Sequence, residues 1–157
     1  MRLTLFALAA ALALTGCKPS LIAGTKIPDT KDTRAALEVL SKYKDAVEAL
    51  NADGVVALAA PSYFDKGDPS KGVSSRDYAG LKAGLAEDFK HLKTVKIDAT
   101  IKDVRVDGDT ALIDYYLVMH YMLVVPSTNK FPWKDDQDDA QLRLVRVNGE
   151  WKVQSGL

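Results

Sequence analysis

Residues 95–124 decide the fold, and their sequence is VKIDATIKDVRVDGDTALIDYYLVMHYMLV. Before the central Asp107-Gly108 pair, apolar and polar residues alternate, as is typical of a strand with one buried face. After it, residues 110–124 are rich in Tyr, Val, Ile and Leu, most of which favour strands. An Asp-Gly pair suits the positive φ of a two-residue turn. The stretch therefore predicts two long antiparallel strands joined as a hairpin.

The turn also predicts the register of this hairpin, which can be counted outward from it. Val95 then lies opposite His120. Because residues 95–101 alternate cleanly, we expect their face to be the inner one. That face would also carry three polar residues of the second strand, Asp114, Tyr116 and His120. The outer face would hold Ile113, Tyr115, Leu117, Met119 and Tyr121. A β-bulge is common in long bent strands and would exchange the two faces beyond it.

Composition excludes several functions. The chain has 157 residues, 21 of them basic and 21 acidic, so its formal net charge is zero. This length suits one domain with its own core. A neutral chain gives no electrostatic reason to bind nucleic acid. The sequence has no glycine-rich phosphate loop and no Cys-His spacing typical of a metal site, so we expect no cofactor and no metal.

The first residues have the pattern of a targeting signal. Met1-Arg2 gives a short positive region, and an apolar run over residues 3–14 follows, too short to span a membrane. The next residues, Leu14-Thr15-Gly16-Cys17, resemble the bacterial lipoprotein signal, and Cys17 is the only cysteine of the chain. The alternative is an ordinary secretory peptide that happens to contain a cysteine.

The lipoprotein resemblance implies cleavage before Cys17 and acylation, including palmitate, that anchors the protein to a membrane. Lys18 follows the cysteine, in place of the Asp that usually retains lipoproteins in the inner membrane. The resemblance therefore implies an outer-membrane anchor facing the periplasm. We divide the chain into a signal peptide (1–16), a lipidated Cys with a tether (17–30) and a folded domain (31–157).

Helical patterns precede the hairpin. An apolar stripe over residues 29–50 predicts an amphipathic helix, and residues 55–60 predict a second, short one. A third helix is expected to open at Ser74. Gly80 and Gly84 each disfavour this helix by about 1 kcal/mol relative to Ala. We expect that these glycines allow close approach to the sheet.

The rest of the chain follows the long hairpin. Residues 125–138 predict a loop in which Phe131 and Trp133 either close over the concave face as a lid or pack on the sheet edge. The loop runs into four acidic residues, Asp135, Asp136, Asp138 and Asp139. They lack the spacing of a calcium loop, so we expect a solvated acidic turn. A second hairpin, residues 140–156, turns at Asn148-Gly149.

Helices followed by an antiparallel sheet predict an α+β fold. The order resembles the nuclear-transport-factor-2-like superfamily, which includes SnoaL-like and ketosteroid-isomerase-like proteins. The motifs that carry the resemblance are NADGVVALAAP (51–61), VRVDGDTA (104–111) and LRLVRVNGEWKV (142–153). It implies a cone in which the N-terminal helices pack on a curved antiparallel sheet. The superfamily includes enzymes, binding modules and assembly domains, so the fold does not decide the function.

A cavity in such a cone would be lined by the inner face of the sheet. The expected ligand-binding residues are therefore Asp114, Tyr116, His120, Arg146 and Trp133. Asp114 and Tyr116, roughly 6–7 Å apart along a strand, are the candidates for catalysis. Asp114 and His120 would be roughly 20 Å apart, too far for a catalytic dyad. Alternatively, Arg146 forms a structural ion pair with Asp114.

Three functions remain open. The main expectation is a membrane-anchored lipoprotein whose domain binds a small apolar ligand without catalysis. The second is a structural or assembly lipoprotein, in which the apolar outer face from Ile113 to Tyr121 is covered by a second copy in a homodimer. The third is a SnoaL-like or isomerase-like enzyme that uses Asp114 and Tyr116.

Overall fold

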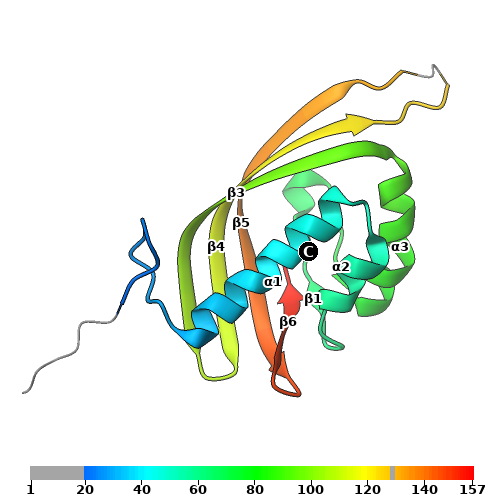
Figure 1. The fold of residues 1–157 in the computed structure, drawn as a ribbon. Coiled ribbons are helices and arrows are strands. Elements are labelled where there is room, and N and C mark those ends of the chain that lie inside the picture. The colour runs from blue at the N-terminus through cyan, green and yellow to red at the C-terminus, as the bar shows by residue number, and fades with distance from the viewer. Residues whose placement is uncertain (1–19, 128–129) are drawn as a thin grey trace, which may run out of the picture.

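The computed structural model describes residues 20–127 and 130–157. In this part of the chain, three α-helices lie on the concave face of a curved four-stranded antiparallel sheet (Figure 1). The predicted signal peptide and Cys17 lie outside the described residues. No helix among the described residues is both long and apolar enough to cross a membrane.

The order of elements agrees with the predicted α+β fold. The helices are α1 (Lys31–Glu48), α2 (Ala52–Leu58) and α3 (Tyr78–Lys90), with a 3-10 turn, η1 (Pro69–Lys71). The main sheet consists of β3 (Leu92–Asp107), β4 (Thr110–Leu123), β5 (Trp133–Val147) and β6 (Glu150–Ser155), in that spatial order. The short strands β1 (Phe64–Asp65) and β2 (Arg76–Asp77) form a separate pair.

Each helix begins where a side chain accepts a hydrogen bond from its first turn. Thr30 caps α1, which confirms the predicted start of that helix. Asn51 caps α2, which therefore begins earlier than predicted. α3 begins at Tyr78 rather than after Ser74, because Asp77 is its cap. The residues immediately before Tyr78 are extended and pair as β2.

The long hairpin is present, but its predicted register is wrong. A β-bulge between Ile101 and Asp103 shifts the pairing of β3 with β4 by one residue. The turn also lies one residue later than predicted, at Gly108-Asp109, because Asp107 pairs with Thr110. Together the two changes place Val95 opposite Tyr121 rather than His120. Because a one-residue shift moves every side chain to the other face, the predicted inner and outer faces of β4 are exchanged.

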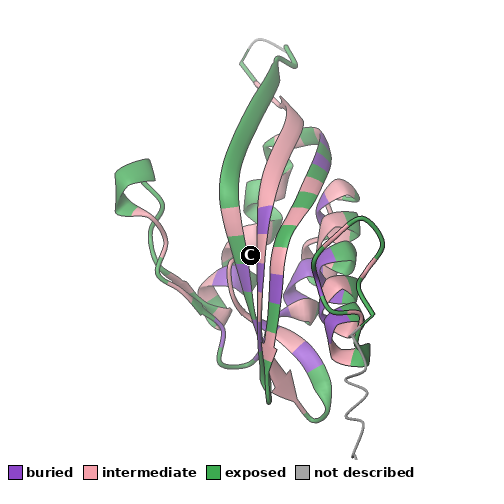
Figure 2. Ribbon diagram, turned by 90° about the vertical axis from the view of Figure 1, so that its left-hand side faces the viewer, coloured by how far each residue is buried: buried purple, intermediate pink, exposed green. Residues whose placement is uncertain are grey.

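The hydrophobic core lies between the helices and the concave face of the sheet (Figure 2). Ile113 and Tyr115, expected on the outer face, are 0% and 2% exposed. Burial raises the pKa of Tyr115. The other large side chains that are fully buried come from both layers: Leu81, Leu142, Leu144, Val55, Val95 and Val153. The helices of the same chain therefore cover Ile113 and Tyr115 of the face that we expected a second copy to cover, while Leu117, Met119 and Tyr121 are half-buried beside the core.

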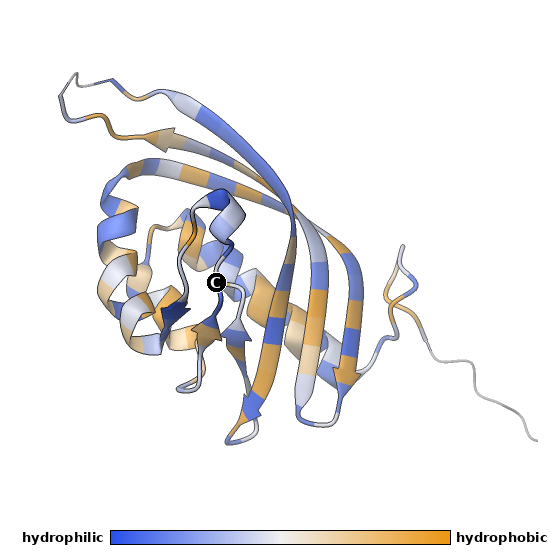
Figure 3. Ribbon diagram, turned by 180° about the vertical axis from the view of Figure 1, so that it is seen from behind, coloured by the Kyte–Doolittle hydropathy of each residue, from blue (hydrophilic) through white to orange (hydrophobic). Residues whose placement is uncertain are grey.

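Residues 133–139 form the first half of β5 rather than the predicted loop and acidic turn. β6 pairs only with residues 143–147, so this half of β5 is an edge of the sheet. Figure 3 shows it as a long hydrophilic segment. The carboxylates of Asp136 and Asp138 each accept a hydrogen bond from the next main-chain N–H group at 2.9 Å. Charged edges resist pairing with other strands, so the acidic run protects this edge.

The second hairpin is confirmed. Asn148 and Gly149 form its turn, with φ values of 51° and 85°. β5 pairs with β4 on one side and β6 on the other. Trp151 is 6% exposed and packs in the core.

Residues 20–30, which we assigned to a tether, contact the domain. Leu21 and Pro28 form a β-bridge, and Ile27 is a core residue that is 3% exposed. The folded domain thus begins before the predicted boundary at residue 31. Ile27 packs in the same core cluster as residues of α1 and of the main sheet.

Glu48 links the end of α1 to β3. Its carboxylate accepts a hydrogen bond from the main-chain N–H of Ile97 at 2.8 Å. The amino groups of Lys44 and Lys96 lie 3.4 and 3.3 Å from the same carboxylate. The Ile97 hydrogen bond, assisted by the two lysines, lowers the pKa of Glu48.

We expect Glu48→Gln to lower the free energy of unfolding by about 1 kcal/mol near neutral pH, because a charged acceptor becomes neutral. The pKa of Glu48 is lower in the folded than in the unfolded chain. Its stabilising effect is therefore complete above the unfolded-state pKa and is lost as pH falls through the folded-state pKa. Urea unfolding of both proteins from about pH 7 to about pH 3 measures this. A difference that persists unchanged at the acid end would contradict it.

Candidate functional site

A cleft of about 1240 Å³ lies between residues 64–77 and the edge of the sheet. We call residues 64–77 the arm; it stands away from the sheet in Figure 2. The arm forms one wall of the cleft, and residues 138–141 of β5 form the other. Side chains and main chain at its inner end come from Tyr63, Leu117, Gly156 and Leu157.

Two glycines shape the arm. Gly67 and Gly72 have φ values of 66° and 72°, which glycine adopts without strain. A Cβ atom on Gly67 would overlap the main-chain oxygens of Val73 and Ser74. Between the glycines, the side chain of Asp68 caps η1. The arm therefore has a defined conformation that depends on glycine at its base.

Tyr63 and Asp65 fix the inner end of the cleft. The two carboxylate oxygens of Asp65 accept hydrogen bonds from the N–H groups of Gly67 and Gly156, each at 2.7 Å. The Tyr63 hydroxyl donates to the main-chain oxygen of Leu157 at 3.2 Å. Burial, with the Asp65 carboxylate nearby, raises the pKa of Tyr63 to about 12. Tyr63 therefore acts as a hydrogen-bond donor, and Asp65 holds the arm to the end of β6.

Arg76 lies along α3, over Gly80 and Gly84. A Cβ atom on Gly84 would lie 3.6 Å from the guanidinium carbon of Arg76. The same guanidinium pairs with Asp88 at 2.9 Å. We expected these glycines to allow close approach to the sheet; instead they make room for the Arg76 side chain.

The cleft is acidic. Lys71 and Arg76 are the cationic residues among its described lining. Five lining residues are acidic: Asp65, Asp68, Asp77, Asp138 and Asp139. Lys71 pairs with Asp138 across the mouth of the cleft. That hydrogen bond raises the pKa of Lys71 and lowers the pKa of Asp138. Both cations are in ion pairs, and Asp139 pairs with Lys102 as well. The three other carboxylates, Asp65, Asp68 and Asp77, leave a negative charge in the cleft that favours a cationic ligand.

Apolar groups share the same cleft. Phe64 and Val73, both on the arm, are each 52% exposed. Leu117 of β4 faces them from the concave side of the sheet. A ligand with an apolar part could therefore be held between the arm and the sheet.

The predicted site residues Asp114, Tyr116 and His120 lie on the convex face of the sheet, outside the cleft. Their neighbours are cross-strand side chains: Arg105 and Gln141 at Asp114, Lys102 over the Tyr116 ring, and Asp135 at 2.6 Å from His120. The expectation that they line the concave face is wrong, because the bulge in β3 turns them outward. Asp114 and Tyr116 therefore do not face a common cavity.

Arg146 lies opposite Trp151 in the second hairpin and does not form the expected ion pair with Asp114. Its guanidinium lies 4.2 Å from the centre of the Trp151 ring, and Nη2 lies 2.9 Å from Asp32 of α1. It lines a smaller hollow of about 380 Å³ beside α1.

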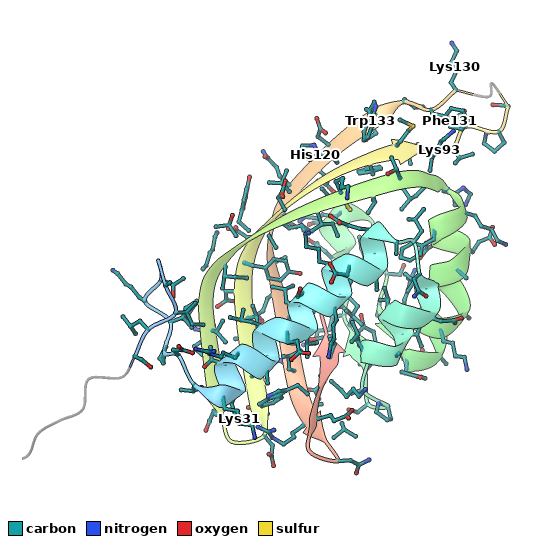
Figure 4. The ribbon with its side chains drawn as sticks, viewed as in Figure 1. Lys31, Lys93, His120, Lys130, Phe131 and Trp133 are labelled. Atoms are coloured by element: carbon teal, nitrogen blue, oxygen red, sulfur yellow. The ribbon has the colours of Figure 1, made fainter. Side chains whose placement is uncertain are left out.

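Trp133 does not form part of either hollow. Trp133 and Phe131 are 58% and 36% exposed at the far end of β5, beyond the helices (Figure 4). The predicted lid over the concave face is therefore not formed. Within the described chain no three acidic, His or Cys side chains gather as metal ligands, and the acidic run stays spread along β5.

Sequence reasoning missed Tyr63, Asp65 and Arg76 as site residues. The clearest signal in the sequence is the segment 66–72, which contains two glycines and a proline, as is typical of a loop. Nothing local shows that this loop faces β5, because the two walls of the cleft are far apart in sequence.

Solved structures with the same fold support the architecture. One is a conserved protein from Planctomyces limnophilus (13% identity, TM-score 0.69, covering 80% of this chain and 92% of that one). A second is a candidate dehydratase of the NTF2-like family from Streptomyces avermitilis (16%, 0.63, 80% and 93%). A third, from Caulobacter vibrioides, is an uncharacterized protein with a cystatin-like fold (18%, 0.64, 81% and 87%).

No protein-family model and no curated protein matches the sequence. At identities this low, the similarity to solved structures concerns the fold alone. The chain therefore has the cystatin-like α+β fold found in NTF2-like proteins.

Proposed function

We propose that this protein is an exported lipoprotein, anchored through Cys17 to the outer membrane, whose domain binds a small cationic and partly apolar ligand. The ligand would lie in the cleft between the arm and β5. The observation that carries this proposal is the acidic cleft itself, with its exposed Phe64 and Val73. Ligand sites commonly combine an apolar wall with a few polar groups that set orientation.

Binding rather than catalysis is supported by the groups at the inner end of the cleft. A general base needs a free acceptor within reach of the substrate. Both oxygens of Asp65 already accept main-chain hydrogen bonds. Tyr63, with its raised pKa, holds its proton near neutral pH. His91 and His120 do not line the cleft. The dehydratase named above therefore gives no reason to assign its reaction here.

We expect 2-phenylethylamine to bind more tightly than 3-phenylpropionate. The two compounds share a phenylethyl group, but one is a cation and the other an anion near neutral pH, and the acidic cleft attracts the cation. The double variant Asp68→Asn with Asp77→Asn should bind the amine about tenfold more weakly, since two nearby negative charges are lost. Asn also accepts capping hydrogen bonds, so η1 and α3 keep their caps. Isothermal titration calorimetry measures both affinities.

The matched control is Asp53→Asn, an exposed Asp→Asn change in the first turn of α2 and outside the cleft. It should leave affinity for the amine unchanged. Equal binding of amine and carboxylate, or unchanged affinity of the double variant, would refute the proposed ligand class.

The anchor is tested separately. We expect Cys17→Ser to release the protein into the soluble fraction after a wash with about 1 M salt, because acyl chains resist salt whereas surface charges do not. Fractionation with an immunoblot measures this. A variant that stays with the membrane after the wash would contradict lipid anchoring through Cys17.

A further inference from the structure

The sheet extends past the helices and ends in a small group of lysine and aromatic side chains. We call Lys93, Lys130, Phe131, Trp133 and Lys134 the ribbon tip; Figure 4 shows four of them at this end of the molecule. Main-chain hydrogen bonds hold this end in place, from Leu123 N to Pro132 O at 3.1 Å and from Val125 N to Lys130 O at 3.2 Å. The side chains of the tip are therefore presented from a hydrogen-bonded hairpin.

The aromatic residues of the tip are open to solvent. Trp133 is 58% exposed and Phe131 is 36% exposed, although side chains of this size usually lie inside a domain. Trp133 lies beside Met122 of β4 on the convex face. The amino group of Lys93 lies 3.9 Å from the centre of the Phe131 ring. The tip thus places two large apolar groups next to positive charge.

The three lysines of the tip, like Lys26, Lys31, Lys66 and Lys82, lie outside the ion pairs of the described chain. Ion pairs in the described chain involve seven lysines: Lys42, Lys44, Lys71, Lys90, Lys96, Lys102 and Lys152. None of these pairs includes a lysine of the tip. The acidic run of β5 begins only after Lys134, and its Asp135 already contacts His120. The end of the sheet therefore carries net positive charge.

We propose that the ribbon tip binds the surface of an anionic lipid bilayer. Trp and Phe favour the interface between headgroups and acyl chains, where an aromatic body is buried and polar groups stay wet. Lysines near the surface add attraction to anionic headgroups. The tip combines both features. Its three lysines would be attracted to an anionic bilayer but not to an uncharged groove on a protein.

This contact is independent of Cys17. The first described residues lie at the opposite end of the domain from the ribbon tip (Figure 1). If both contacts are made to one membrane, the long axis of the domain lies along the bilayer.

The test uses residues 20–157, in which one core cluster joins Ile27 to the helices and the main sheet, and vesicles of about 30% phosphatidylglycerol in phosphatidylcholine. Trp151→Phe leaves Trp133 as the sole tryptophan. We expect flotation with the vesicles, a blue shift of Trp133 emission and its quenching by brominated lipid. Phe131→Ala with Trp133→Ala should lower the partition coefficient at least about tenfold, measured by flotation.

Replacing Lys93, Lys130 and Lys134 with Gln should lower the partition coefficient about a hundredfold, because each lysine contributes a factor of about five. The matched control replaces three exposed lysines away from the tip, Lys26, Lys66 and Lys82, and should bind almost as the parent does. Absence of flotation, or unchanged emission of Trp133 on addition of vesicles, would overturn the proposal. The tip would then be a candidate surface for binding a protein instead of a bilayer. Equal partitioning of the aromatic variant would also overturn it, because binding would then be adsorption by charge alone.

Discussion

Tyr115→Ala should lower the free energy of unfolding by about 3–5 kcal/mol, whereas Tyr116→Ala should change it by less than about 1 kcal/mol. The two residues are chemically identical neighbours that point to opposite faces of β4. Tyr115 is 2% exposed in the core between sheet and helices. Tyr116 lies on the convex face below Lys102. Truncating Tyr115 leaves a cavity, but truncating Tyr116 removes only a partly solvated ring.

Urea unfolding of the two variants measures this difference directly, and the control is built into the pair. Equal losses would mean that both rings are similarly buried. A larger loss of unfolding free energy for the Tyr116 variant would support the register predicted from the turn alone. In that register Asp114, Tyr116 and His120 face the helices.

Trp151→Ala should cost a similar amount, about 3–5 kcal/mol, because it removes the largest core side chain of β6. The ring is 6% exposed and also supports Arg146, whose guanidinium lies 4.2 Å from its centre. Losing the ring therefore loosens the contact of Arg146 with Asp32 of α1 as well.

Trp151→Phe separates packing from polarity. The indole N–H of Trp151 is buried and has no hydrogen-bond partner among the described residues. Phe removes this unpaired donor while keeping an apolar ring, so we expect a loss of only about 1 kcal/mol. Urea midpoints of both variants measure the losses. A Phe variant as unstable as the Ala variant would contradict this account of Trp151.

Much of the fold follows from local sequence. The turn at Asn148-Gly149 and the helical stripe before residue 50 lie where expected, and the long hairpin turns one residue later than predicted, at Gly108-Asp109. These features depend on backbone φ preferences and on one buried face, and both leave a pattern in neighbouring residues.

The register error also had a signal in the sequence. The apolar positions of β3 are odd-numbered up to Ile101, but the next buried position is the even-numbered Val104. That change of phase marks the bulge, where one extra residue enters the strand. Counting from the turn without this phase change reversed the faces of β4.

The edge half of β5 could not be predicted in this way. Residues 133–139 are all exposed, so neither face imposes the alternation that identifies a strand. The cleft was missed for a related reason. Its walls are the arm and β5, which only the completed fold brings together.

The central claim is that ligand binds beside the sheet, between the arm and β5, while the concave face is filled by the core. Amide NMR of residues 20–157 during titration with 2-phenylethylamine tests it most directly. We predict shifts concentrated in residues 64–77, 138–141 and 156–157, with little change at Asp114, Tyr116 and His120. Shifts centred on those three residues, or no saturable shifts in the arm, would contradict it.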